Sequence, residues 1–154
     1  MIETMQTALV QTGAFLAIGI AAMGSSYGCG VAGASAVGAW KKCYVQGKAA
    51  PFQLAILTGV PMSQTIYGLI LMLMINGSKA APSYWPVMLA MGVLGGIAIA
   101  MSAAFQGRAA AGACDAFVES NGKGFVNYLI ALGVIETIAI FVMVFAILLM
   151  SKLG

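Results

Sequence analysis

The chain has 154 residues, of which 62% are hydrophobic and 7% are charged, and its formal net charge is +3. A soluble globular domain has roughly a quarter of its residues charged, so the composition excludes that class and indicates a chain embedded in a bilayer. The positive charge is too small to indicate nucleic acid as a partner.

Four long apolar segments follow one another along the chain, at 5–39, 52–75, 84–117 and 125–150. Each is at or above the roughly 20 residues that cross a hydrocarbon core, so we predict an all-α membrane protein with four transmembrane helices. The first and third segments are longer than a bilayer requires, and both are predicted to protrude on one side. The start of the chain, MIETMQ, has no basic cluster and does not read as a cleavable signal peptide.

The basic residues divide unevenly between the two ends of the predicted helices. Lysine and arginine tend to accumulate on the cytoplasmic side of a membrane protein. We therefore predict that the loops joining helices one to two and three to four are cytoplasmic and that both termini lie outside. The end with the two predicted cytoplasmic loops carries Lys41, Lys42, Lys48, Arg108 and Lys123, and the opposite end carries Lys79 and Lys152.

The two halves of the chain resemble each other. IAAMGSSYGCG at 20–30 matches IAIAMSAAFQG at 97–107, and SQTIYGL at 63–69 matches IETIAIF at 135–141. The second match places a glutamine of the first half opposite a glutamate of the second. The pattern indicates a duplication in which one loop was shortened.

The duplication predicts two tandem helical hairpins, residues 1–78 and 79–154. Because the second contains the glutamate within the apolar segment, it is predicted to carry an ion. Each hairpin has an even number of helices, so both enter the membrane in the same direction; inverted-repeat transporters need opposed copies, although a parallel repeat stays open. From 19 to 39, 16 of 21 residues are Gly, Ala, Ser or Cys. Such slim helices allow close approach, and we predict a ring of identical copies, with a compact monomeric bundle as the alternative.

Glu136, Gln64 and Gln106 are predicted to lie at one depth in the membrane. Each is 12 or 13 residues from the cytoplasmic end of its segment, which is about 18–20 Å along a helix. An ionised carboxylate near the bilayer centre is costly, so it indicates a functional site unless a structural partner neutralises it. The basic residue at a similar depth is Arg108, and a structural Glu136–Arg108 pair is the alternative.

Pro61 interrupts the second segment at the same level. It lacks an amide proton and cannot serve the carbonyl of Leu57, so we predict a kink that loosens the backbone. Ser63, Gln64 and Tyr67 then share one sector beside the kink.

These groups together supply one carboxylate, two amide oxygens, a hydroxyl and a freed carbonyl. A divalent ion usually recruits several carboxylates, whereas a single negative charge with several neutral oxygens suits a monovalent hard cation. A proton needs only a carboxyl in an apolar pocket. We therefore predict bound Na⁺ as the transported ion, with H⁺ as the alternative.

Three motifs, PMSQTIYG at 61–68, QGRAAAG at 106–112 and VIETIAIF at 134–141, resemble the proteolipid rotor subunit of V-type ATPases. The similarity is greatest to the sodium-transporting bacterial branch. The resemblance implies a rotor-ring subunit that carries Na⁺ on a glutamate across the membrane. It also implies that this membrane is a bacterial plasma membrane. The residues it implies are Glu136, Gln64, Ser63, Gln106 and the backbone carbonyl of Val60 as ligands, with Tyr67 and Pro61 in support.

The same resemblance implies partners outside this chain: identical copies in a ring, a stator membrane subunit with an arginine, a central-stalk subunit on the cytoplasmic face, and lipids. The sequence holds no GxxxxGK[ST] nucleotide-binding motif. We therefore predict a non-catalytic subunit of an ATP-driven pump, with no cofactor besides the transported ion. A small ion-coupled secondary transporter is the alternative from another class.

Overall fold

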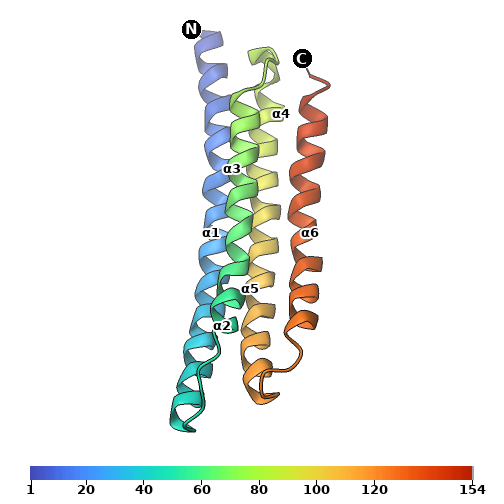
Figure 1. Cartoon of the computed structure of the whole chain (residues 1–154). Coiled ribbons are helices and arrows are strands. Elements are labelled where there is room, and N and C mark those ends of the chain that lie inside the picture. The colour runs from blue at the N-terminus through green and yellow to red at the C-terminus, as the bar shows by residue number, and fades with distance from the viewer. Residues whose placement is uncertain (154) are drawn as a thin grey trace.

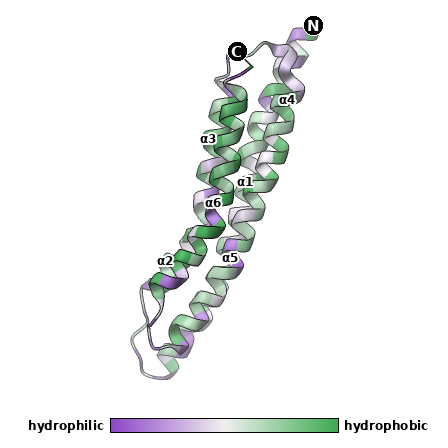
Figure 2. Ribbon diagram, turned by 90° about the vertical axis from the view of Figure 1, so that its right-hand side faces the viewer, coloured by the Kyte–Doolittle hydropathy of each residue, from purple (hydrophilic) through white to green (hydrophobic). Residues whose placement is uncertain are grey.

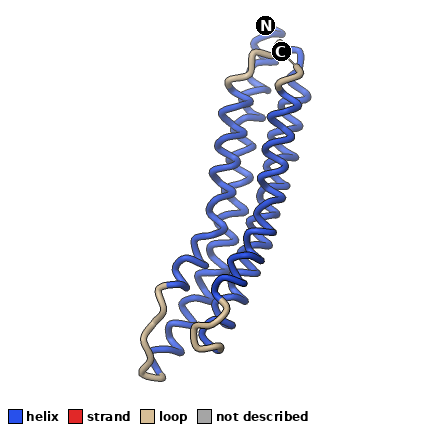
Figure 3. Tube along the Cα trace, turned by 45° about the vertical axis from the view of Figure 1, so that its right-hand side comes forward, coloured by secondary structure: helices blue, strands red, loops and turns tan. Residues whose placement is uncertain are grey.

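The computed structural model describes residues 1–153, and in this range it contains helices and connecting loops but no strand. Four helical spans are long and apolar enough to cross a membrane. They run as nearly continuous helix between short loops (Figure 3). The predicted class, all-α with four membrane-spanning helices, is confirmed. The spans are Ile2–Val45, Gln53–Asn76, Pro82–Glu119 and Phe125–Met150.

The first span is a single helix, α1, from Ile2 to Val45. The predicted segment ended at residue 39, and the observed helix continues through the polar residues that follow. Loss of apolar character marks where a helix leaves the hydrocarbon core, but it does not interrupt backbone hydrogen bonding. The helix ends just before Gly47, whose φ of 63° is left-handed and is easily adopted by glycine.

The second span changes helix type at its proline. It consists of α2 (Gln53–Gly59), the 3₁₀ turn η1 (Val60–Met62) and α3 (Ser63–Asn76). Pro61 lies in the 3₁₀ turn, where the tighter winding accommodates a residue without an amide proton. The sequence predicted a kink at this residue, and the structure has a change of helix type there. The turn sets the direction in which the first residues of α3 face.

The third span contains a π-helical segment that the sequence did not predict. Here the backbone of Gly92 lies so close to Gly13 of α1 that a Cβ atom at Gly92 would overlap it. The absence of side chains permits this approach, and the helix accommodates it by a local change of winding. The elements are the 3₁₀ turn η2 (Pro82–Tyr84), α4 (Trp85–Ala90), the π segment η3 (Met91–Gly95) and α5 (Gly96–Glu119).

The last span, α6 (Phe125–Met150), lies at the edge of the bundle (Figure 1). It packs against α3 and α5, while α1 packs against α3 and, most extensively, against α5. The N- and C-termini lie at one end of the bundle, and the loops at 46–52 and 120–124 lie at the other. The molecule is therefore a long bundle with its chain reversals at two separate ends.

Glycine residues bring the backbones of α1 and α5 together. A Cβ atom at Gly107 would overlap the backbone of Gly28, and one at Gly24 would overlap the backbone of Ala100. In lipid, helix association depends on such close packing because the surrounding tails are as apolar as the helices. Close approach through small residues, predicted from residues 19–39, thus occurs in this helix pair.

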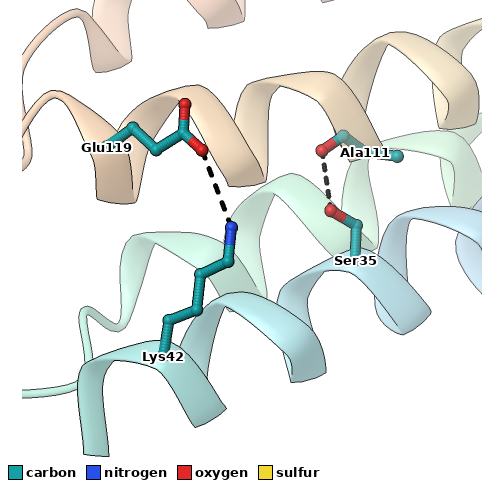
Figure 4. Close-up of polar contacts among 4 residues, drawn as sticks. All are labelled: Ser35, Lys42, Ala111 and Glu119. Atoms are coloured by element: carbon teal, nitrogen blue, oxygen red, sulfur yellow. Dashed lines mark hydrogen bonds and ion pairs between the residues drawn. The ribbon is translucent and has the colours of Figure 1, made fainter. Parts of the chain in front are cut away.

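Polar contacts join α1 and α5 near the end of the bundle that holds the loops at 46–52 and 120–124 (Figure 4). The Ser35 hydroxyl donates to the carbonyl oxygen of Ala111 at 2.8 Å, and Lys42 Nζ lies 3.6 Å from a carboxylate oxygen of Glu119. Both side chains of the ion pair are well exposed, so the pair contributes little to stability. It lies between the last turn of α1 and the last residue of α5.

The outer surface of the bundle is mainly apolar. Figure 2 shows ribbons that are largely green or pale, interrupted by purple segments. Large apolar side chains are exposed on every span, and α6 buries only three residues within the chain. Such a surface suits contact with lipid or with further copies of the chain. Examples are Phe15, Met23, Ile66, Met101, Phe105, Ile138 and Phe141.

Candidate ion-binding site

Three helices place polar side chains at one level in the interior of the bundle. The 3₁₀ turn at Pro61 leads directly into Ser63 and Gln64, which open α3. Helix α5 contributes Gln106, and α6 contributes Glu136. The two glutamines are completely buried, with 0% of their surface exposed. A buried amide must find hydrogen-bond partners, so this layer has to be internally connected.

Glu136 receives one hydrogen bond on each carboxylate oxygen. Tyr67 of α3 donates its hydroxyl to Oε1 at 2.6 Å, and Gln106 donates Nε2 to Oε2 at 3.4 Å. The glutamate is only half-buried. Both donors are neutral, so they orient the carboxylate and leave its negative charge uncompensated within the chain.

The two glutamines are bonded to each other. Gln64 donates Nε2 to Oε1 of Gln106 at 2.7 Å, and Gln106 also donates to the carbonyl of Leu132 at 2.9 Å. Gln106 therefore connects α3 to two positions on α6. Its side chain is fixed from both sides, as a ligand for a small ion needs to be.

Ser63 and the backbone carbonyl of Val60 complete the predicted set at its outer edge. The Ser63 hydroxyl lies 3.1 Å from the Val60 oxygen and 3.2 Å from Oε1 of Gln64. The Val60 oxygen also accepts the amide of Ser63, in the 3₁₀ turn. A continuous series of hydrogen bonds thus runs from Val60 to Glu136. The predicted ligands lie along it, Tyr67 bonds its last member, and Pro61 lies beside it in the 3₁₀ turn.

Arg108 is not the partner of Glu136. Its guanidinium Nη2 lies 3.1 Å from the hydroxyl of Tyr27 on α1, and its Cζ is 5.7 Å from the ring centroids of both Tyr27 and Phe105. Arg108 is exposed, and the ion pair found among residues 1–153 is between Lys42 and Glu119. A structural Glu136–Arg108 pair, the alternative that the sequence left open, is therefore absent from the part of the chain described.

Ser102 belongs to the polar layer, and it was not predicted from the sequence. It donates to the carbonyl of Ile135 at 2.9 Å and lies 3.5 Å from Nε2 of Gln64, with 4% of its surface exposed. Ser102 precedes Gln106 by four residues and so faces the same side of α5. That spacing was the available signal, but a small serine in a helix rich in Gly and Ala also fits plain helix packing.

This arrangement can hold a small cation better than a multivalent metal. Among the described residues, no group of three or more His, Cys, Asp or Glu side chains lies together. The layer contains one carboxylate, together with neutral amide, hydroxyl and carbonyl oxygens from α3, α5 and the 3₁₀ turn η1. One bound monovalent ion would neutralise it, whereas a divalent ion would leave a positive charge in a medium of low polarity.

Tyr67→Phe is expected to accelerate exchange of a bound ion without removing a ligand. The variant loses the 2.6 Å bond to Glu136, and a hydrogen bond to a charged group is worth about tenfold or more in a rate or equilibrium. Release of radioactive sodium from purified assemblies measures the effect. Tyr27→Phe, which removes a hydroxyl bonded to Arg108, serves as the control, and equal release from the two variants would contradict the role of Tyr67.

Comparison with known proteins gives two matches. Residues 89–149 match the family of ATP synthase C subunits. The chain is also similar to the A-type ATP synthase subunit K of Methanocaldococcus jannaschii, with 36% identity over 142 residues that cover 90% of this chain. The chain spans 60% of the length of that relative. The family match includes Gln106 and Glu136, and the longer similarity extends over both hairpins.

Proposed function

Because residues 89–149 match the family of ATP synthase C subunits, we propose that this chain is a membrane rotor-ring subunit of a rotary ATPase that carries Na⁺ on Glu136. The similarity to the A-type ATP synthase subunit K of Methanocaldococcus jannaschii over 90% of the chain supports the assignment as a subunit of such a machine. The subunit itself is non-catalytic, since ATP chemistry belongs to a separate part of such machines. Identical copies form the ring.

One observation carries the choice of ion: a single membrane-embedded carboxylate bounded by neutral donors from two other helices. The oxygens within this layer are those of Glu136, Gln106, Gln64, Ser63 and Val60. A proton carrier has no use for so many oxygens, whereas a sodium ion that sheds its water must replace each lost contact. The surplus of neutral oxygen therefore favours Na⁺ over H⁺.

Occupancy of the site controls rotation in this proposal. With Na⁺ bound, Glu136 is neutralised and its face of the ring can move past lipid. Without a bound cation, the carboxylate makes the same movement costly. A stator subunit with an arginine releases the ion, and a central-stalk subunit turns the ring from the cytoplasmic loops.

The first hairpin carries Gln64 at the position where the second carries Glu136, so we propose one ion per four helices, as in V-type machines. Moving one charge across 100 mV corresponds to about 2.3 kcal/mol. A ring that moves fewer charges per turn can work against a larger gradient for each ATP. This supports pumping over synthesis as the direction of the complete machine.

Sodium is expected to protect Glu136 from reaction with a carbodiimide in the purified ring. The reagent attacks a protonated, accessible carboxyl group, and a bound cation excludes both the proton and the reagent. Labelling should fall with increasing sodium at constant pH and constant ionic strength, with potassium as the control salt. If labelling depends on pH alone and is indifferent to sodium, the site carries protons.

A further inference from the structure

Ser25 of α1 is the one buried side-chain oxygen among residues 1–153 without a hydrogen-bond partner. Only 4% of the residue is exposed. A helical serine in an apolar setting normally donates to a carbonyl three or four residues earlier. Leaving a buried hydroxyl unpaired is unfavourable, so this exception requires an explanation.

The packing of α1 on α3 places Ser25 opposite Gln64. A Cβ at Gly68 would meet Ala21, and a Cβ at Gly28 would meet Pro61. In both pairs the residue numbers add to 89, as expected for antiparallel helices in register, and the same sum pairs Ser25 with Gln64. The unpaired hydroxyl of Ser25 therefore lies at the level of the proposed ion site. It belongs to α1, which supplies none of the other residues of that site.

The packing of α1 on α5 gives the same level independently. Gly24 faces Ala100, and Ser35 bonds the carbonyl of Ala111. Each pair is separated by 76 residues, as expected for parallel helices, and this offset places Ser25 beside the turn that holds Ser102. Ser102 forms the longest hydrogen bond of the layer, at 3.5 Å from Gln64.

The orientation of the Gln64 amide gives Ser25 a role. In the structure, Nε2 of Gln64 lies 2.7 Å from Oε1 of Gln106, which leaves no space for a cation between the two side chains. Both amide oxygens can contact one cation only if the Gln64 amide turns so that its oxygen replaces its nitrogen. The turned amide then places its two N–H groups where Oε1 now lies, beside Ser63. Ser63 can accept one of them, and the helix register leaves the unpaired hydroxyl of Ser25 as the acceptor for the other.

We propose that Ser25 positions Gln64 for ion binding, by accepting a hydrogen bond from its amide nitrogen when the amide oxygen contacts the cation. This inference rests on the proposed function. It adds α1 to the helices that determine sodium affinity. Ser25 contacts no ion itself, so its effect must pass entirely through Gln64.

Ser25→Ala is the test, measured as the sodium concentration that halves carbodiimide labelling of Glu136 in the assembled ring. We expect that concentration to rise about fivefold, the ratio that corresponds to one neutral hydrogen bond. The thermal stability of the ring should be unchanged or higher, because an unpaired buried hydroxyl has been removed. Ser26→Ala, which alters the exposed neighbour, should match the unmodified ring.

A double-mutant cycle separates positioning from a general packing effect. If Ser25 acts through Gln64, adding Ser25→Ala to Gln64→Ala should cause no further change in sodium affinity. An equal loss in both backgrounds, or no loss in either, overturns the inference while leaving the sodium function standing. Absence of sodium protection in the unmodified ring contradicts the proposed function and the inference together.

Discussion

Glu136→Gln is expected to abolish ion transport while leaving assembly of the ring intact. The amide has nearly the shape of the carboxylate and can still meet Tyr67 and Gln106, which are its two hydrogen-bond partners. It supplies no negative charge, however. Removing one partner of a buried ion pair costs about 3–5 kcal/mol, which corresponds to a loss of affinity of about a hundredfold or more.

The measurement is sodium uptake into vesicles that contain the complete machine, with particle size confirming assembly. Glu119→Gln is the matched control, because it makes the same chemical change at a carboxylate that is exposed and paired with Lys42. Its transport should be close to that of the unmodified protein. Normal transport by the Glu136 variant would refute the assignment of this residue as the ion carrier.

Gly107→Ala is expected to destabilise the helix bundle strongly, although it adds only one methyl group. The added Cβ would overlap the backbone of Gly28, and backbone atoms cannot move aside as a flexible side chain can. Overpacking of this kind costs about 1–3 kcal/mol, and a direct backbone clash lies at the upper end of that range. Because Gln106 is the preceding residue, separation of α1 from α5 should also disturb the ion site.

Gly112→Ala provides the control on the same helix, since a Cβ at Gly112 meets no atom within 4 Å. Thermal unfolding in detergent and the yield of folded protein should distinguish the two variants. The Gly112 variant is expected to behave as the unmodified chain or to be slightly more stable, because alanine favours helix over glycine. Equal stability of the two variants would contradict the importance of the Gly28–Gly107 contact.

The spans of the fold were predictable from local properties of the sequence. Apolar length located all four membrane-crossing helices. Pro61 located the interruption of the second span, predicted as a kink, where the structure has a 3₁₀ turn. The true end of α1 at Val45 was not predictable from hydropathy, because a helix continues into water wherever its backbone bonds are satisfied. The π segment at Met91–Gly95 was missed because it accompanies the close approach to Gly13, a residue distant in sequence.

Much of the candidate site was predictable from depth alone. Counting residues from the helix ends put Gln64, Gln106 and Glu136 in one layer, and the structure joins them by hydrogen bonds. Ser102 and Ser25 were not predicted. Whether a small serine in a helix rich in Gly and Ala faces a site or only fills space depends on how the helix is rotated.

The sequence by itself determined that this chain spans a membrane four times and holds one acid at the level of two glutamines. These are consequences of apolar length and of the rise per residue of a helix, which need no knowledge of neighbouring helices. Only the tertiary structure decided that Arg108 contacts Tyr27 rather than Glu136, and that Ser102 joins the polar layer through the carbonyl of Ile135. The choice of partner depends on helix rotation, which the glycine contacts between α1 and α5 fix.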